Sequence, residues 1–166
     1  MDKHYKWDVI VRITHWAVAG LFFANYFVTE EGSEIHEWVG YCIIGSIVIR
    51  LVWGMVTRSP ARLSAFKPSV TQAVTHLSEV ISTRVDASVG HNPAGAVMIW
   101  LMWCGLLATA VTGWMAHVEL MGYKDGLKEI HEVFANLTFI AVAIHICAVI
   151  VMSRWTNRSY LSGMLK

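Results

Sequence analysis

The sequence predicts an all-α membrane protein: a four-helix transmembrane bundle with an amphipathic interfacial helix between the second and third spans. Two observations lead to this fold class. Charged residues make up 15% of the 166 residues and hydrophobic residues 55%, whereas soluble domains carry about 25% charged residues. The apolar residues also gather in four stretches, each close to the ~20 residues that a helix needs to cross the hydrocarbon. We therefore expect one membrane-integral domain over residues 1–166.

The four apolar stretches are separated by polar connections and define the expected spans. A basic N-terminal segment precedes the first stretch, and no small-residue cleavage site follows it, so we expect a retained helix rather than a removable signal. Pro93 marks the start of the third stretch. The expected spans are residues 9–28, 36–56, 93–116 and 131–152.

A shorter segment between the second and third spans has one apolar face. Apolar residues recur there at helical spacing, while polar residues occupy the positions between them. This pattern predicts an amphipathic helix lying on the membrane interface. The apolar residues are Val70, Val74, Leu77, Ile81 and Val85.

The distribution of charge orients the bundle. With four spans both termini lie on one side, and eleven of the 13 basic residues belong to that side, which is therefore expected to be the cytoplasm. They are Lys3, Lys6, Arg12, Arg50, Arg58, Arg62, Lys67, Arg84, Arg154, Arg158 and Lys166. The opposite side has a local balance of −5, with Lys124 and Lys128 against Glu30, Glu31, Glu34, Glu37, Glu119, Asp125 and Glu129. A cationic partner is expected to dock on that side, whereas the net charge of +1 gives no general attraction to nucleic acid.

Histidines within the spans are the strongest functional candidates, because ionisable groups in hydrocarbon are costly. His131 and His145 lie 14 residues apart on the fourth span, which places them within about 40° of one face and about 21 Å apart along the helix. His36 opens the second span at the level of His131. His15 lies about 9 Å inside the first span, at the level of His145.

These two depth pairs predict two bis-imidazole sites stacked across the membrane. Haem b needs only two axial ligands, so His15 with His145 and His36 with His131 predict two haems b. Histidines that are merely hydrogen-bonded between helices are the simpler alternative, but four unliganded imidazoles would each need a separate partner in hydrocarbon. Zinc is a weaker alternative, because neither level supplies a Cys or carboxylate for a tetrahedral set.

Two arginines are candidates for the haem propionates. Arg50 lies 14 residues after His36 on the same face, and its guanidinium suits a carboxylate in charge and geometry. Snorkelling to the cytoplasmic surface is the equally weighted alternative. Arg12, about one turn outside His15, is the second candidate.

Taken together, these residues resemble a known family. Arg12-x-x-His15-Trp16, His36, Arg50, the run Gly90-His91-Asn92-Pro93-Ala94-Gly95, and His131 with His145 are similar to the bacterial cytochrome b561 and nickel-iron hydrogenase b-type cytochrome family. The resemblance covers nearly the whole chain. It implies a cytochrome b of the inner membrane that passes electrons to or from quinone.

The related cytochrome b subunits of formate dehydrogenase imply a quinone site at the cytoplasmic-side haem. Carried onto this sequence, the resemblance implicates His145 and Asn92, with Gly95 allowing close approach. The short connection between the first two spans departs from hydrogenase subunits, which disfavours a hydrogenase partner.

Three functions follow as hypotheses. The favoured one is electron exchange between a periplasmic redox protein, such as a c-type cytochrome, and the quinone pool. The second is a stand-alone superoxide:quinone oxidoreductase, whose external site should be cationic, whereas acidic residues outnumber Lys124 and Lys128 here. The third is a membrane anchor with structural haems. The sequence does not decide whether the chain is an enzyme, and it is compatible with a homodimer.

Overall fold

The computed structural model describes residues 6–88, 90–119 and 122–165, which form helices and no strands. Lys3 and Lys166, two of the residues used to orient the bundle, lie outside the described residues. The helices are α1 (Val9–Phe27), α2 (Glu34–Val56), α3 (Val70–Thr83), α4 (Pro93–His117), α5 (Lys124–Trp155) and α6 (Ser162–Leu165), with a short 3-10 helix, η1 (Leu63–Ala65). Four of them, α1, α2, α4 and α5, are long and apolar enough to cross a membrane. The prediction of four spans is thereby confirmed.

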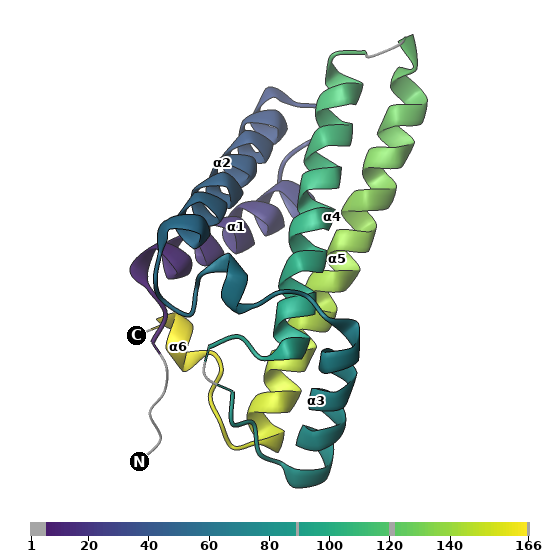
Figure 1. Ribbon diagram of the computed structural model, residues 1–166. Helices are drawn as coiled ribbons and strands as arrows, with labels where there is room; N and C mark the ends of the chain where they lie inside the picture. The colour runs from purple at the N-terminus through teal and green to yellow at the C-terminus, as the bar shows by residue number, and fades with distance from the viewer. Residues whose placement is uncertain (1–5, 89, 120–121, 166) are drawn as a thin grey trace.

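Two helical hairpins make up the bundle. α1 contacts α2, α4 contacts α5, and the hairpins meet between α2 and α4 (Figure 1). The first and last described residues lie at one end of the bundle, which we call the terminal end. The connections after α1 and α4 lie at the other, which we call the loop end (Figure 1).

Local sequence signals fix where three of the helices begin. The Ser33 hydroxyl accepts a hydrogen bond from the His36 amide and caps α2. The Ser69 hydroxyl caps α3 by accepting from the Gln72 amide. The Asn92 side chain caps α4 by accepting from the Gly95 amide, and Pro93 occupies the first helical position. The backbone N–H at that position makes no hydrogen bond within a helix, so proline is tolerated there.

Small residues on α4 let α5 approach closely. A Cβ atom on Gly105 would lie 2.6 Å from the hydroxyl oxygen of Thr138, and one on Gly113 would lie 2.9 Å from the ring of His131. Thr138 is buried as a result. The face of α5 that carries His131 and Thr138 therefore lies against a strip of α4 without bulky side chains.

An apolar cluster joins three of the long helices. Phe22 of α1, Ile43 and Ile47 of α2 and Leu106 of α4 are buried together. On α1 and α5, the rings of Tyr26 and Phe139 stack at 4.7 Å, and the Tyr26 hydroxyl donates to Asn136 at 2.6 Å. These contacts hold α1 and α5 together between the levels of His131 and His145.

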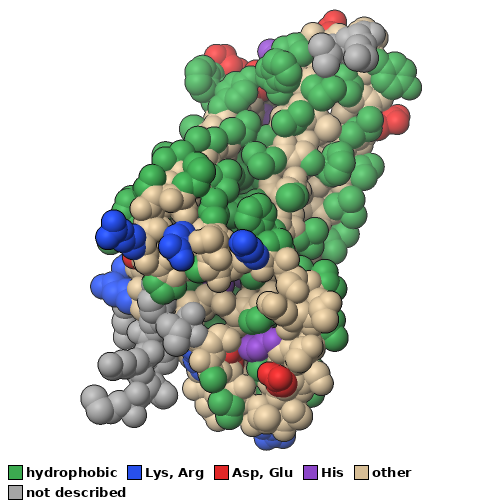
Figure 2. All heavy atoms as spheres, viewed as in Figure 1, with side chains coloured by type: hydrophobic (Ala, Val, Ile, Leu, Met, Phe, Trp, Pro, Cys, Tyr) green, Lys and Arg blue, Asp and Glu red, His purple; other side chains and the backbone are tan. Residues whose placement is uncertain are grey.

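Hydrophobic side chains cover most of the visible face of the long helices, with a band of Lys and Arg towards the terminal end (Figure 2). Many large apolar residues on the long helices are exposed, among them Ile13, Val48, Leu101 and Ile140. An exposed apolar surface of this extent is typical of a protein whose surroundings are lipid.

The C-terminal segment folds back onto the start of α1. The Trp7 amide donates to Gly163, the Arg12 guanidinium to the Leu165 carbonyl and the Trp16 indole to the Met164 carbonyl. Met164 also lies against a small core of Trp7, Val11 and Ala61. The helix α6 therefore covers part of the terminal end.

Candidate functional site

The structure brings His36 and His131 together at the loop end. Their ring centres lie 6.0 Å apart, with the ring planes at 75°. A bond from a metal ion to an imidazole nitrogen is about 2 Å long, so one metal ion between two ring nitrogens sets the ring centres about 6 Å apart. The pair therefore has the spacing of two axial ligands.

Both rings are oriented through one nitrogen. His131 Nδ1 lies 2.8 Å from the Thr109 carbonyl oxygen, to which it donates, and His36 Nδ1 lies 3.1 Å from the Thr29 hydroxyl. Metal-binding histidines commonly use the second nitrogen in this way, which fixes the ring and its tautomer. Each ring keeps Nε2 for a ligand. Nothing in the sequence pattern indicated these two threonines.

His15 of α1 and His145 of α5 lie nearer the terminal end. The two residues lie close enough to interact electrostatically. His15 Nδ1 is buried and has no hydrogen-bond partner among the described residues. A buried nitrogen in this state is unfavourable unless a bound group satisfies it. The His15 ring, unlike those of His36 and His131, is not oriented through Nδ1 by a described residue, and the pair is a candidate for the second haem.

The geometry disfavours zinc at either level. In the part of the chain that the structure describes, no group of three or more His, Cys, Asp or Glu residues could hold a metal ion. Two imidazoles are enough for haem iron, whose other four ligands come from the porphyrin. Both pairs therefore remain candidate haem ligands.

Arg50 is buried in the protein and does not extend to the surface. Its side chain lies over the rings of Phe66 and Trp103, and Nη2 donates to the Ala61 carbonyl at 3.0 Å. Nη1 has no hydrogen-bond partner among the described residues. The snorkelling alternative does not describe this side chain.

Arg50 and His15 lie at one level on neighbouring antiparallel helices. Val11 of α1 lies near Trp53 of α2 at one end of this interval, and Phe22 contacts Ile43 at the other. Arg12 donates to the C-terminal backbone at Leu165, at 3.1 Å. Arg50 likewise donates Nη2 to a backbone carbonyl, and Nε of Arg12 also lacks a partner among the described residues, so both arginines remain propionate candidates.

Asn92 and Gly95 are held in the cap of α4. Asn92 Oδ1 accepts from the Gly95 amide at 2.6 Å, and Nδ2 donates to Asp86 at 3.0 Å. A Cβ atom on Gly95 would lie 3.0 Å from Asn92 Oδ1, so the glycine makes room for the cap itself. One amide hydrogen of Asn92 remains for another acceptor.

Asp86 is a buried anion that sequence reasoning missed. Its carboxylate accepts from the Tyr160 hydroxyl at 2.6 Å, from Asn92 and from the Ser88 amide at 2.9 Å. His76 of α3 and Arg158 lie within 4 Å of it. Burial opposes ionisation of this carboxyl, but the hydrogen bonds outweigh it and lower the pKa of Asp86 to about 2. Asp86 thus joins α3, the cap of α4 and the C-terminal segment.

Replacing Asp86 by Ala should lower the free energy of unfolding by about 1–3 kcal/mol, because buried donors lose their acceptor. The wild-type carboxyl has a pKa of about 2 against an ordinary 3.8. Its stabilising contribution is therefore complete above pH ~4 and is lost as the pH falls towards ~2. Thermal unfolding in detergent, followed by circular dichroism, should show this loss in the wild type and not in Asp86→Asn. The same pH profile in both proteins would contradict the role of Asp86.

His91 is enclosed by aromatic rings beside the cap of α4. Its ring centre lies 4.2 Å from that of Trp7 and 4.3 Å from that of Phe66. Burial, and then the charge of Arg50, lower the pKa of His91 to about 3. The side chain is therefore neutral at physiological pH.

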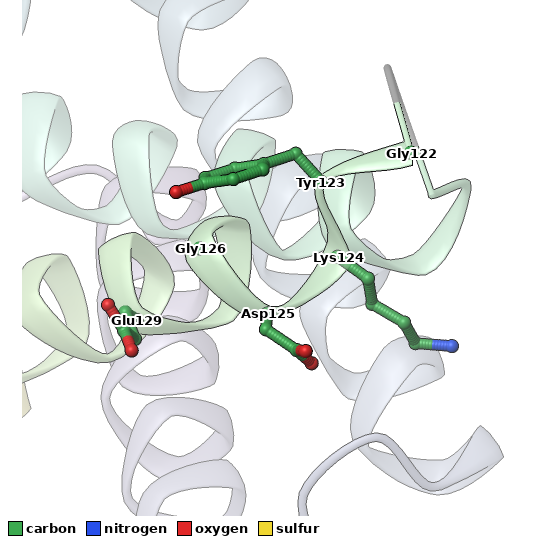
Figure 3. Close-up of a pocket in the computed structure, with 6 residues that line it drawn as sticks. All are labelled: Gly122, Tyr123, Lys124, Asp125, Gly126 and Glu129. Atoms are coloured by element: carbon green, nitrogen blue, oxygen red, sulfur yellow. The ribbon is translucent and has the colours of Figure 1, made fainter.

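The loop end carries charge of both signs. His117 Nδ1 contacts Glu37 across α4 and α2, and Lys124 is paired with Glu119. A surface depression of about 270 Å³ at the start of α5 is lined by Gly122, Tyr123, Lys124, Asp125, Gly126 and Glu129 (Figure 3). With two carboxylates and one lysine that is already paired, this depression does not provide the cationic site expected for superoxide.

Comparison with known proteins gave one match. A family model described as prokaryotic cytochrome b561 matches residues 6–166. No curated protein sequence and no solved structure matches the chain.

Proposed function

The chain belongs to the prokaryotic cytochrome b561 family, whose members transfer electrons through b-type haem in the membrane, and on this premise we propose a specific electron path. The path runs between a periplasmic redox protein, such as a c-type cytochrome, and the quinone pool. Two haems b carry it, one held by His36 and His131 and the other by His15 and His145. The haems supply the redox chemistry, and the protein sets their spacing, surroundings and access.

The His36–His131 pair is the observation that carries this proposal. Two imidazoles from different hairpins lie at the spacing of axial ligands, and each is oriented through Nδ1. The His15–His145 pair, whose members interact electrostatically, is proposed as the second axial pair, about 21 Å further along α5. Two haems at these levels would link the two membrane surfaces.

The orientation of the bundle in the membrane is assigned from the distribution of charge. The basic terminal end is assigned to the cytoplasm by the positive-inside rule, in a multi-pass protein of the bacterial inner membrane. The acidic loop end then faces the periplasm. Under this assignment His36 and His131 hold the periplasmic-side haem.

The quinone site is assigned to the cytoplasmic-side haem, beside His145, Asn92 and Gly95. The relation to formate dehydrogenase cytochrome b subunits suggests this place. A quinone carbonyl requires a donor as negative charge develops on it, and the remaining amide hydrogen of Asn92 is one such donor. Asp86 holds the Asn92 amide in position for this role.

Helix α3 is assigned to the cytoplasmic membrane interface. Ala73 and Val80 are buried against the protein, whereas Val70, Val74 and Ile81 are exposed. An exposed apolar stripe on a helix attached to a membrane bundle is accounted for by contact with lipid.

The acidic loop end gives a testable docking surface. Glu30, Glu31 and Glu34 are exposed, and Glu37 is partly engaged by His117. Electron exchange with a basic c-type cytochrome should slow several-fold as salt is raised, because complementary charges increase the association rate and salt screens them over about 8 Å at physiological strength. Stopped-flow measurements on reconstituted vesicles at varied salt measure this dependence.

Replacing the four glutamates by Gln should reproduce the slow rate already at low salt. Glu79→Gln, the same kind of substitution at a single exposed position of α3, is the control and should leave the rate unchanged. A rate that responds neither to salt nor to the four substitutions would place docking elsewhere. Rapid haem reduction by superoxide, with no exchange with any cytochrome, would instead support the superoxide:quinone oxidoreductase hypothesis.

A further inference from the structure

Five buried side-chain nitrogen atoms have no hydrogen-bond partner among the described residues, and two of them reach one region near the terminal end. One is Nη1 of Arg50, on α2, and the other is Nδ1 of His91, immediately before α4. The two side chains are close enough to interact electrostatically. They reach the same region from different elements of the fold.

Aromatic side chains wall this region. The Phe66 ring centre lies 4.3 Å from the His91 ring centre and 5.7 Å from Arg50 Cζ. Trp7 covers another side of His91, and Trp103 lies 5.4 Å from Arg50 Cζ. Rings on both residues exclude water, so neither nitrogen can rely on solvent for an acceptor.

The absence of a side chain at Gly54 makes room for the guanidinium itself. A Cβ atom on Gly54 would lie 2.8 Å from Arg50 Nη1 and equally close to Leu63. A side chain at position 54 would therefore displace the guanidinium.

The nearest carboxylate does not satisfy Arg50. Asp8 interacts with Arg50 electrostatically, but its Oδ2 accepts from the Trp53 indole and the Ser59 hydroxyl. An arginine is charged at all relevant pH values, and a buried charge without a hydrogen-bonded counter-charge is strongly unfavourable. The missing acceptor is therefore expected to be an anion.

We propose that Arg50 and His91 together bind one carboxylate, a propionate of the haem held by His15 and His145. This inference rests on the proposed function. A carboxylate has two oxygens and can accept from both a guanidinium and an imidazole N–H. Arg50 lies at the level of His15 on the neighbouring helix, and a propionate attached to a bound haem reaches a dry site more readily than a hydrated ion.

The consequence is a positioning role for His91 and control of one haem potential. A positive charge at a propionate disfavours the extra charge of the oxidised haem, so it raises the midpoint potential. His91 fixes the second carboxylate oxygen and thereby the propionate itself. The haem of His36 and His131, at the other level, should be unaffected.

The test is a redox titration of both haems in the purified holoprotein. The haem held by His15 and His145, here called the inner haem, is identified by its loss in His15→Ala. Arg50→Gln should lower the reduced-to-oxidised ratio of the inner haem about tenfold at fixed ambient potential, which is ~59 mV for a one-electron couple. His91→Phe, which keeps the ring contacts with Trp7 and Phe66, should shift it in the same direction by less. Arg62→Gln, an exposed residue with the same charge change, is the control and should shift neither haem.

Infrared redox difference spectra with isotope-labelled propionates give a second readout. The propionate carboxylate band should move in Arg50→Gln and in His91→Phe, and His91→Gln, which restores an N–H donor, should return it towards the wild-type position. If Arg50→Gln fails to accumulate, the carboxylate band in the two His91 variants still tests the propionate assignment. An unchanged band and potential in variants that retain two haems would overturn the proposal and leave the proposed function intact.

A soluble anion is the competing occupant. Titrating inorganic phosphate or formate into the wild type should leave the inner haem potential unchanged if a propionate fills the site. A shift with either anion that is absent in Arg50→Gln would overturn the propionate assignment. A separate result, fewer than two haems in the wild-type protein, would contradict the proposed function itself.

Discussion

Replacing His15 by Ala is expected to give a protein that keeps one haem b and loses the other. His15 and His145 are the expected axial pair, and His91, the other histidine near this level, is enclosed by the rings of Trp7 and Phe66. His145→Ala should lose the same haem. His36→Ala and His131→Ala should each lose the second haem, since their rings share one site. Pyridine haemochrome spectra give the haem count for each variant, and redox spectra identify which haem remains.

His117→Ala is the matched control. This histidine also lies at the end of a span, but it contacts Glu37, so both haems should remain. The pairing by depth would be wrong if His15→Ala and His36→Ala removed the same haem. It would also be wrong if a single substitution at either level left both haems low-spin.

Substitution of Asn92 is expected to slow electron exchange with quinone at least tenfold while both haem spectra stay intact. The loss corresponds to about 1.4 kcal/mol of stabilisation in the transition state. Asn92→Leu removes the amide donor but also the cap of α4, which costs about 1 kcal/mol of stability. Asn92→Ser separates the two effects, because serine is a good N-cap and lacks the amide. Both variants should be slow and both lose the hydrogen bond to Asp86, but Asn92→Ser should unfold at a higher temperature than Asn92→Leu because it keeps the cap.

A substitution at the opposite end tests the side of the membrane. His117→Leu should leave quinone turnover unchanged, since it lies at the loop end. If His117→Leu abolished turnover while both Asn92 variants turned over normally, the quinone site would lie at the other haem. The proposed electron path across the membrane would then have to be redrawn with quinone at the periplasmic-side haem.

The sequence predicted the long helices because their apolar length is a local property. The first span was expected at residues 9–28 and is Val9–Phe27, and the third was expected at 93–116 and is Pro93–His117. The fourth was expected to begin at residue 131, but α5 begins at Lys124. The additional turns at the start of α5 carry Lys124, Asp125, Lys128 and Glu129. Hydropathy does not assign such charged turns to a span, although the helix includes them.

The shared level of the histidines could be predicted from helix geometry alone. Depth along a helix follows from residue number, so the sequence alone predicts that His36 and His131 share a level. The rotation of each helix about its axis depends on which side chains pack between helices. Sequence spacing therefore gave no sign that Thr29 and Thr109 would orient the two rings.

Contacts between distant segments were not predictable. Asp86 is one acidic residue in a polar connection, and its partners Asn92 and Tyr160 come from positions six and 74 residues away. The docking of the C-terminal segment on Trp7 and Arg12 is equally non-local. These contacts arise when the chain folds back on itself, and no periodic pattern encodes them.

The haem content of the purified wild-type chain tests the central claim most directly. Pyridine haemochrome analysis against amino-acid quantitation should give two haems b per chain. Electron paramagnetic resonance of the oxidised protein should show both to be low-spin, because two imidazoles are strong axial ligands. A fully loaded preparation with one haem per chain, or with either haem high-spin, would contradict the two bis-histidine sites.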